Sequence, residues 1–100
     1  MTRGTTPTFT LTLPETVDLS LAAKVYATFK QDTKKLTKTG DDITVGSHTV
    51  DVFLSQEETL SFYGGDVEVQ LNWTYDDGKR ACTNIVTIHV LKNLEAVVLQ

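Results

Sequence analysis

A chain of 100 residues, 40% hydrophobic and 22% charged, has the composition of a single globular domain. Its formal net charge of −4 gives it no general attraction to phosphate, so nucleic acid is not an expected partner. Cys82 is the only cysteine, which excludes an intramolecular disulfide. No stretch approaches the roughly 20 apolar residues of a membrane span, so no membrane partner is expected.

The first half of the chain alternates polar and apolar residues in short runs. This period of two predicts strands over residues 8–13, 24–31, 34–39, 43–45 and 48–54. In the first of them Phe9 and Leu11 share one face, and threonines occupy the other. The third run is rich in lysine and predicts an edge strand, because lysines deter edge-to-edge pairing. Gly46-Ser47 predicts a type II′ hairpin turn between the last two strands.

The second half opens with a helix signal. The spacing of Ser55 and Glu58 matches a capping box and predicts a single helical turn. Residues 67–74 alternate through four periods, which predicts a long strand with Trp73 in the core. Asp77-Gly78 is a hairpin signal, because glycine accepts the positive φ of the turn. Residues 80–91 then predict one long returning strand, on which Cys82 is expected to be a small buried side chain.

About seven short strands and one helical turn predict an all-β fold, an antiparallel β-sandwich resembling an immunoglobulin-like domain. A barrel is the competing fold. The single domain spans residues 1–100, with a polar and unpaired N-terminal arm over 1–7 and an apolar C-terminal tail over 93–100. Two roles stay open for the tail: it adds an edge strand to its own sandwich, or it docks on a neighbouring subunit.

Side chains with catalytic chemistry do not fall into a recognisable pattern, and the chain is expected not to be an enzyme. Cys82 and His89 are seven residues apart, which places them on opposite faces of one strand unless a bulge intervenes. Ser47, His48 and Asp51 lack the glycines of a nucleophile elbow. The spacings of zinc and calcium ligands are missing, so neither a metal nor another cofactor is expected.

Contact with other molecules is the remaining function, and a few side chains are candidates for it. Tyr26 and Tyr75 are the expected exposed aromatic residues. The basic cluster of the chain, which includes Lys34 and Lys35, offers a docking patch for an acidic neighbour. The apolar tail over 93–100 offers a hydrophobic docking patch. The predicted interaction residues are therefore Tyr26, Lys34, Lys35, Tyr75, Val97 and Leu99.

The opening Arg3-Gly4-Thr5-Thr6-Pro7-Thr8, followed by Phe9 and by Leu13-Pro14, resembles the start of small proteins encoded in the tail regions of phages and prophages of Gram-positive gut bacteria. Those proteins are similar in length and share stretches like 54–60 and 67–71. The resemblance implies a non-enzymatic structural or assembly protein of a phage or prophage particle, from its tail or baseplate region.

Partners implied by the resemblance are other phage structural proteins or further copies of the chain. The implied location is the virion, or the bacterial cytoplasm during assembly, and no signal peptide is expected, because no apolar stretch follows the first residues. The alternative function is a carbohydrate- or surface-binding β-sandwich module, because loops on a sandwich often carry recognition.

Overall fold

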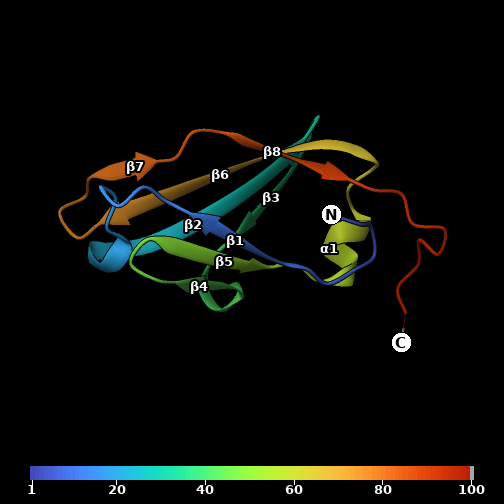
Figure 1. Ribbon diagram of the computed structural model, residues 1–100, viewed down its shortest axis with the longest axis horizontal. Coiled ribbons are helices and arrows are strands. Elements are labelled where there is room, and N and C mark those ends of the chain that lie inside the picture. Colours follow the sequence, from blue (N-terminus) through green and yellow to red (C-terminus); the bar gives the residue numbers. More distant parts are fainter. Residues whose placement is uncertain (100) are drawn as a thin grey trace.

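The computed structural model describes residues 1–99, and its strands form two antiparallel sheets (Figure 1). The strands are β1 (Thr8–Thr12), β2 (Ala22–Gln31), β3 (Lys34–Lys38), β4 (Ile43–Val45), β5 (Thr49–Phe53), β6 (Gly65–Tyr75), β7 (Arg80–Cys82) and β8 (Val86–Val90). The helical elements are the 3-10 turns η1 (Leu19–Leu21) and η2 (Gly40–Asp42) and the α-helix α1 (Gln56–Leu60). The predicted all-β sandwich is confirmed, with eight strands among these residues instead of about seven.

The strand order is that of an immunoglobulin-like domain without its first strand. The smaller sheet has the order β1-β5-β4, which corresponds to strands B, E and D of that fold. In the larger sheet β3, β2 and β6 are followed by β7 and β8, which both pair with β6 and together correspond to strand G. Strand A would lie beside β1. Within residues 1–99 no strand takes that place, so β1 has an open edge.

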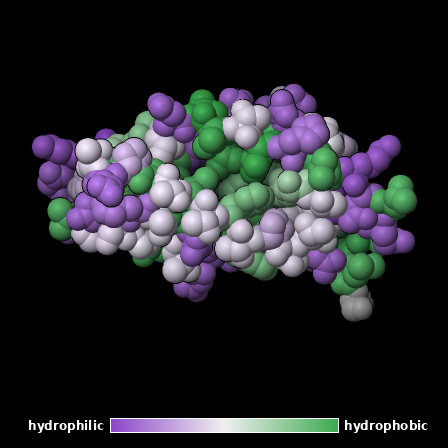
Figure 2. Space-filling view, viewed as in Figure 1, coloured by the Kyte–Doolittle hydropathy of each residue, from purple (hydrophilic) through white to green (hydrophobic). Residues whose placement is uncertain are grey.

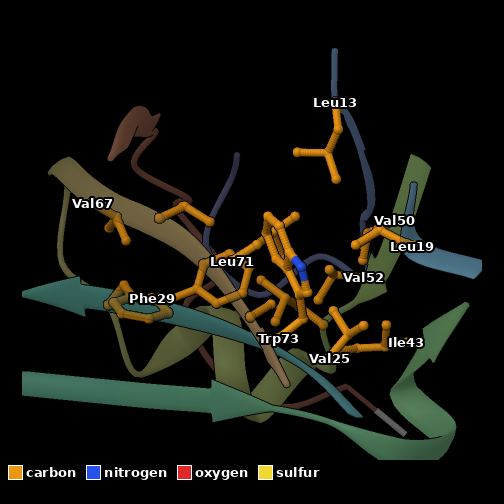
Figure 3. Close-up of a cluster of buried hydrophobic side chains, with 14 of the residues drawn as sticks. Leu13, Leu19, Val25, Phe29, Ile43, Val50, Val52, Val67, Leu71 and Trp73 are labelled. Carbon is orange, nitrogen blue, oxygen red and sulfur yellow. The ribbon is translucent and has the colours of Figure 1, made fainter. Parts of the chain in front are cut away.

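The core fills the space between the two sheets and is centred on β6. The buried residues of this strand are Val67, Val69, Leu71 and Trp73. Figure 3 shows Trp73 in the middle of the cluster, close to Val52 of the opposite sheet. The indole Nε1 of Trp73 donates a hydrogen bond to the Tyr75 hydroxyl at 2.9 Å, which satisfies its polar group. The predicted burial of Trp73 is confirmed, at 3% exposure.

The helical turn α1 closes one end of the sandwich, and the predicted capping box is present. Ser55 Oγ accepts a hydrogen bond from the Glu58 N–H at 3.2 Å, and Glu58 Oε1 accepts one from the Ser55 N–H at 2.8 Å. Phe62 follows the helix and is fully buried, with its ring 6.5 Å from that of Phe29. The helix therefore anchors its end of the sandwich through the aromatic side chain that follows it.

The turn between β4 and β5 differs from the prediction. Three residues, Gly46 to His48, separate the strands, and Gly46 lacks the positive φ that a type II′ turn requires at this position. His48 bonds to the segment that follows β1 instead: its carbonyl accepts from the Leu13 N–H at 2.7 Å, and its Nδ1 lies 2.6 Å from the Val17 carbonyl oxygen.

Candidate functional site

A groove lies along the open edge of the sandwich, between β1 and the β7–β8 segment. Leu11 and Leu13 line it on one side, and Ile85 and Val86 on the other. Its volume is about 390 Å³, within the range of ligand and peptide clefts. The core residues that line its floor are Val69, Leu71 and Trp73. Figure 2 shows hydrophobic residues gathered in a hollow on this face. The groove thus lies directly over part of the apolar core.

The groove exists because the returning strand is broken after β7. Asn72 pairs with Cys82, whereas Val69 pairs with Val86, so the returning segment has one more residue than β6 between these pairs. Thr83 spans the break: its Oγ1 accepts from the Leu71 N–H at 3.1 Å. One extra residue against a regular partner is a β-bulge. The predicted single strand over residues 80–91 is therefore wrong.

The bulge changes which side chains face inward beyond it. Ala81 and Ile88 both pack against the core, although they are seven positions apart, an odd separation that a regular strand would place on opposite faces. Cys82 is exposed, so its predicted burial is wrong. Cys82 and His89 now share the outer face, contrary to the sequence prediction. Their pairing positions on β6 are six residues apart, or about 20 Å, so they form no dyad.

The chain beyond β8 leaves apolar side chains in solvent. Leu94 is fully exposed, and Val97 and Leu99 are 55% and 61% exposed. Within the described part of this tail, residues 93–99, there is no strand. The alternative in which the tail adds an edge strand to its own sandwich is therefore wrong for these residues, and docking on a neighbour stays a prediction. The last residue of the predicted tail, Gln100, lies outside the described residues.

The N-terminal arm is paired, contrary to the prediction for residues 1–7. The amino group of Met1 donates to the His89 carbonyl at 2.9 Å, and the Arg3 N–H donates to the Leu91 carbonyl at 3.1 Å. Arg3 Nη2 also reaches the Leu60 carbonyl at 2.8 Å. The arm stays in place because backbone carbonyl groups at the end of β8 are not hydrogen-bonded to β6. The N–H groups of the arm donate to these carbonyls and so satisfy them. The N-terminal arm therefore covers that end of the sandwich's open edge which lies nearest to α1.

A second hollow, polar in character, lies on the outer face of the larger sheet. Its lining residues are Tyr26, Thr28, Lys35, Thr37, Asn72, Thr74 and Arg80. Arg80 Nη2 donates to Asn72 Oδ1 at 3.0 Å, which orients the guanidinium along the sheet. Two predicted interaction residues, Tyr26 and Lys35, are brought together here. Tyr26 is half-buried and Lys35 is exposed.

The other two predicted residues of the sheet lie elsewhere. Tyr75 is half-buried against the core and accepts the hydrogen bond of Trp73, so it is not the freely exposed aromatic that was expected. Lys34 lies on the opposite face of β3 from Lys35, since successive side chains alternate. Its Nζ is 6.0 Å from the centre of the Phe62 ring. Lys34 and Lys35 therefore form no common basic patch.

One lysine of the predicted edge strand is buried. Lys38 is 5% exposed, and its Nζ lies 2.6 Å from both carboxylate oxygens of Glu58 and 3.1 Å from Asp42 Oδ2. The side chain points between the sheets and not into solvent, so Lys38 does not act as an edge-protecting charge. Apart from the capping box that places Glu58, no local pattern in the sequence signals this ion pair.

The environment of the pair shifts both pKa values. Burial acts to lower the pKa of the Lys38 ammonium, but hydrogen bonds to Glu58 and Asp42 outweigh it and raise the pKa above its ordinary 10.5. Burial likewise acts to raise the pKa of Glu58, but hydrogen bonds from Lys38 and from the Ser55 N–H hold it below its ordinary 4.5. Both groups are therefore charged near neutral pH, and the pair links β3 to α1.

Among residues 1–99, no three histidine, cysteine, aspartate or glutamate side chains come together as a metal ion would need. Within the same range no helix has the length and the apolar character to cross a membrane. Comparison of the chain with models of protein families, with curated proteins and with solved structures finds no match.

Proposed function

We propose that this chain is a non-enzymatic structural or assembly protein of a phage or prophage particle, from its tail or baseplate region, and that it acts by protein–protein contact. Two lines of support combine in this proposal. The opening motif, from Arg3 to Thr8, resembles the start of phage tail-region proteins. The geometry adds surfaces suited to binding protein: an open strand edge, an apolar groove and an exposed apolar tail.

The exposed tail is the observation that carries the proposal. Leu94, Val97, Val98 and Leu99 are each at least 42% exposed within a short segment. Solvent-exposed apolar residues that cluster mark surfaces of association, because water contact with them is unfavourable. Partners in this function are other phage structural proteins or further copies of the chain, in the virion or in the cytoplasm during assembly.

Deletion of the gene from an inducible prophage tests the proposal. We expect induction to release particles that lack infectivity, and a plasmid copy to restore it. The matched comparison uses two plasmid copies, one with Val97→Asp and Leu99→Asp in the tail and one with Lys92→Asp beside it. Only the first should fail to complement. Normal, infectious particles from the deletion strain would refute an essential particle role.

The polar hollow supports a second candidate, a carbohydrate-binding module. Tyr26 offers an aromatic ring there, and Asn72 and Arg80 offer an amide and a guanidinium suited to sugar hydroxyls and acids. Binding on a glycan array should then be lost in Tyr26→Ala and kept in Tyr63→Ala, which removes an aromatic ring that is 72% exposed elsewhere. An array on which the unmodified chain binds nothing would eliminate this candidate.

A further inference from the structure

We infer that the outer face of the larger sheet binds an acidic polysaccharide, a chain of sugars that carries carboxylate or phosphate groups. The inference rests on the second candidate function and deepens it, because it names the class of carbohydrate that the polar hollow would take. Three features of this face carry it: its charge, two lysines that face each other without an acidic partner, and a guanidinium held in place with free donors.

Cations gather on this face although the chain as a whole is acidic. We call it the cationic face, and its outward-facing cations are Lys24, Lys30, Lys35 and Arg80. Among the described strand residues, two carboxylates share it, Glu68 and Asp66, and Asp66 Oδ1 lies 3.1 Å from His89 Nδ1 near the end of β6. The whole chain has a net charge of −4, so the cationic face is opposite in sign to the rest of the molecule. Such a surface attracts anionic ligands.

Two lysines of the cationic face lie directly opposite each other. Lys30 and Lys35 are cross-strand partners on β2 and β3, and like charges in this position destabilise a sheet. Glu68 is the partner of Lys30 on the other side, yet within residues 1–99 no salt bridge joins it to either lysine. Protection of a sheet edge does not explain Lys30, since β2 is paired on both sides at this residue. An anion bound between the two lysines would relieve their repulsion.

Arg80 presents hydrogen-bond donors at the other end of the cationic face. Its Nε and Nη2 donate to Asn72 Oδ1 at 3.3 Å and 3.0 Å, which occupies one edge of the guanidinium. In the part of the chain that the structure describes, the remaining N–H groups on Nη1 and Nη2 make no hydrogen bond. Two such parallel donors match the two oxygens of a carboxylate or phosphate. Asn72 therefore fixes a guanidinium that keeps an anion-binding edge.

Between its two cationic ends the face is uncharged and suited to sugar hydroxyls. The polar hollow has Lys35 and Arg80 in its lining, together with Tyr26, Thr28, Thr37, Asn72 and Thr74. The hydroxyl and amide groups of this set both donate and accept hydrogen bonds. Lys24 and Lys30 are six positions apart on β2, or about 20 Å, so the face has room for several sugar units. A chain of hydroxyl-bearing units with anionic groups along it matches this arrangement.

An acidic protein surface is the alternative partner, and the composition of the face disfavours it. The centre of a protein–protein interface is rich in apolar and aromatic residues and depleted in lysine. From Lys24 onward, the outward-facing residues of β2, β3 and β6 are all polar except the half-buried Tyr26. Hydrogen bonds, charge and a single aromatic ring are better matched to a chain of sugars.

Isothermal titration calorimetry of the whole chain with defined oligosaccharides tests the inference. Hexagalacturonate supplies carboxylates, and a hexamer of mannose units joined by phosphodiesters supplies phosphates, so the two acidic ligands distinguish the anions. The matched neutral ligand is hexagalacturonate with every carboxylate methyl-esterified. We expect at least one acidic ligand to bind, more weakly as the salt concentration rises, and the ester not to bind. No binding of either acidic ligand, or equal binding of the ester, would overturn the inference.

Matched variants locate the site. Lys35→Gln should weaken binding of the acidic ligand about 2- to 5-fold, as expected of one exposed charge. Arg80→Gln should weaken it at least about 10-fold, because it removes hydrogen bonds to a charged group. Lys34→Gln removes the same charge from the opposite face of β3 and should leave the affinity unchanged. All three residues are exposed, so the variants should fold. Equal affinities of Lys34→Gln and Lys35→Gln would overturn the inference.

Hexaglutamate carries the same kind of charge on a peptide and tests the alternative partner. If it binds as tightly as the acidic oligosaccharide, the inference is overturned in favour of an acidic protein.

Failure of this inference and failure of the carbohydrate-binding candidate differ in outcome. A chain that binds neutral glycans through Tyr26 and neither acidic ligand overturns the acidic class alone. A chain that binds no glycan of any kind overturns both. The particle role, tested by deletion of the gene, is independent of either result.

Discussion

Loss of the buried ammonium group of Lys38 gives a direct test of how the sandwich is held together at its α1 end. The substitution Lys38→Met keeps the aliphatic stem and removes only the charge. Glu58, which is 21% exposed at its side chain, then loses its principal cation, while Asp42, 53% exposed, stays in contact with water. The effect of the substitution is therefore that of an uncompensated carboxylate at Glu58.

The magnitude follows from the burial of that carboxylate. Removal of one partner of a fully buried pair costs about 3–5 kcal/mol. Glu58 is partly hydrated and keeps its hydrogen bond from the Ser55 N–H, so we expect a smaller loss than this, about 2–3 kcal/mol. For a domain of this length this loss corresponds to a decrease in Tm of roughly 10–20 °C.

Urea and thermal unfolding followed by circular dichroism measure the loss. The matched control is Lys35→Met, which removes an exposed lysine from the other face of the same strand and should change stability by no more than about 0.5 kcal/mol. The double variant with Glu58→Gln should recover part of the loss, because no buried charge then lacks a partner. If Lys38→Met and Lys35→Met unfold at the same urea concentration, the ion pair does not stabilise the fold.

Three further outcomes are expected. The pKa of Glu58 is held below 4.5 and that of Lys38 is raised above 10.5, so the ion pair contributes fully to stability between pH 4.5 and pH 10.5. This contribution is lost as the pH falls through the lowered pKa of Glu58, or as it rises through the raised pKa of Lys38. Urea midpoints across pH should therefore decline less steeply in acid for Lys38→Met than for the unmodified chain. Phe62→Ala should cost about 3–5 kcal/mol in urea unfolding, against less than about 1 kcal/mol for the exposed neighbour in Tyr63→Ala; equal losses would contradict an anchoring role of Phe62. The exposed thiol of Cys82 should react with a thiol reagent in the native protein about as fast as in urea, and protection of the native thiol would show that the outer face of β7 is covered.

Alternation along the chain was enough to predict most of the core. The inward faces of β1 and β6 are as expected, because a side chain on a strand faces the opposite side from its neighbour whatever the strand pairs with. The capping box was also readable, since both of its hydrogen bonds join residues three apart. Patterns of this kind are local, and they survive any arrangement of the sheets.

The candidate site was much less predictable from the sequence. Residues 80–91 keep a regular apolar pattern, yet an extra residue between Cys82 and Val86 interrupts the regular pairing with β6 and the strand breaks there. The groove depends on this bulge and on the open edge of β1, and both follow from which strands become neighbours. Of the predicted interaction residues, Tyr26 and Lys35 come together across β2 and β3, whereas Tyr75 turns toward the core.

The sequence by itself determined that this chain is an all-β sandwich with Trp73 inside and a helical turn at Ser55, because these features depend on alternation with a period of two and on a capping box between residues three apart. Only the tertiary structure decided that Lys38 is buried beside Glu58, that the arm pairs with β8 and that Cys82 faces solvent. The physical reason is distance along the chain: each of these outcomes requires hydrogen bonds, charges or strand registers between segments that are far apart in sequence and meet only on folding.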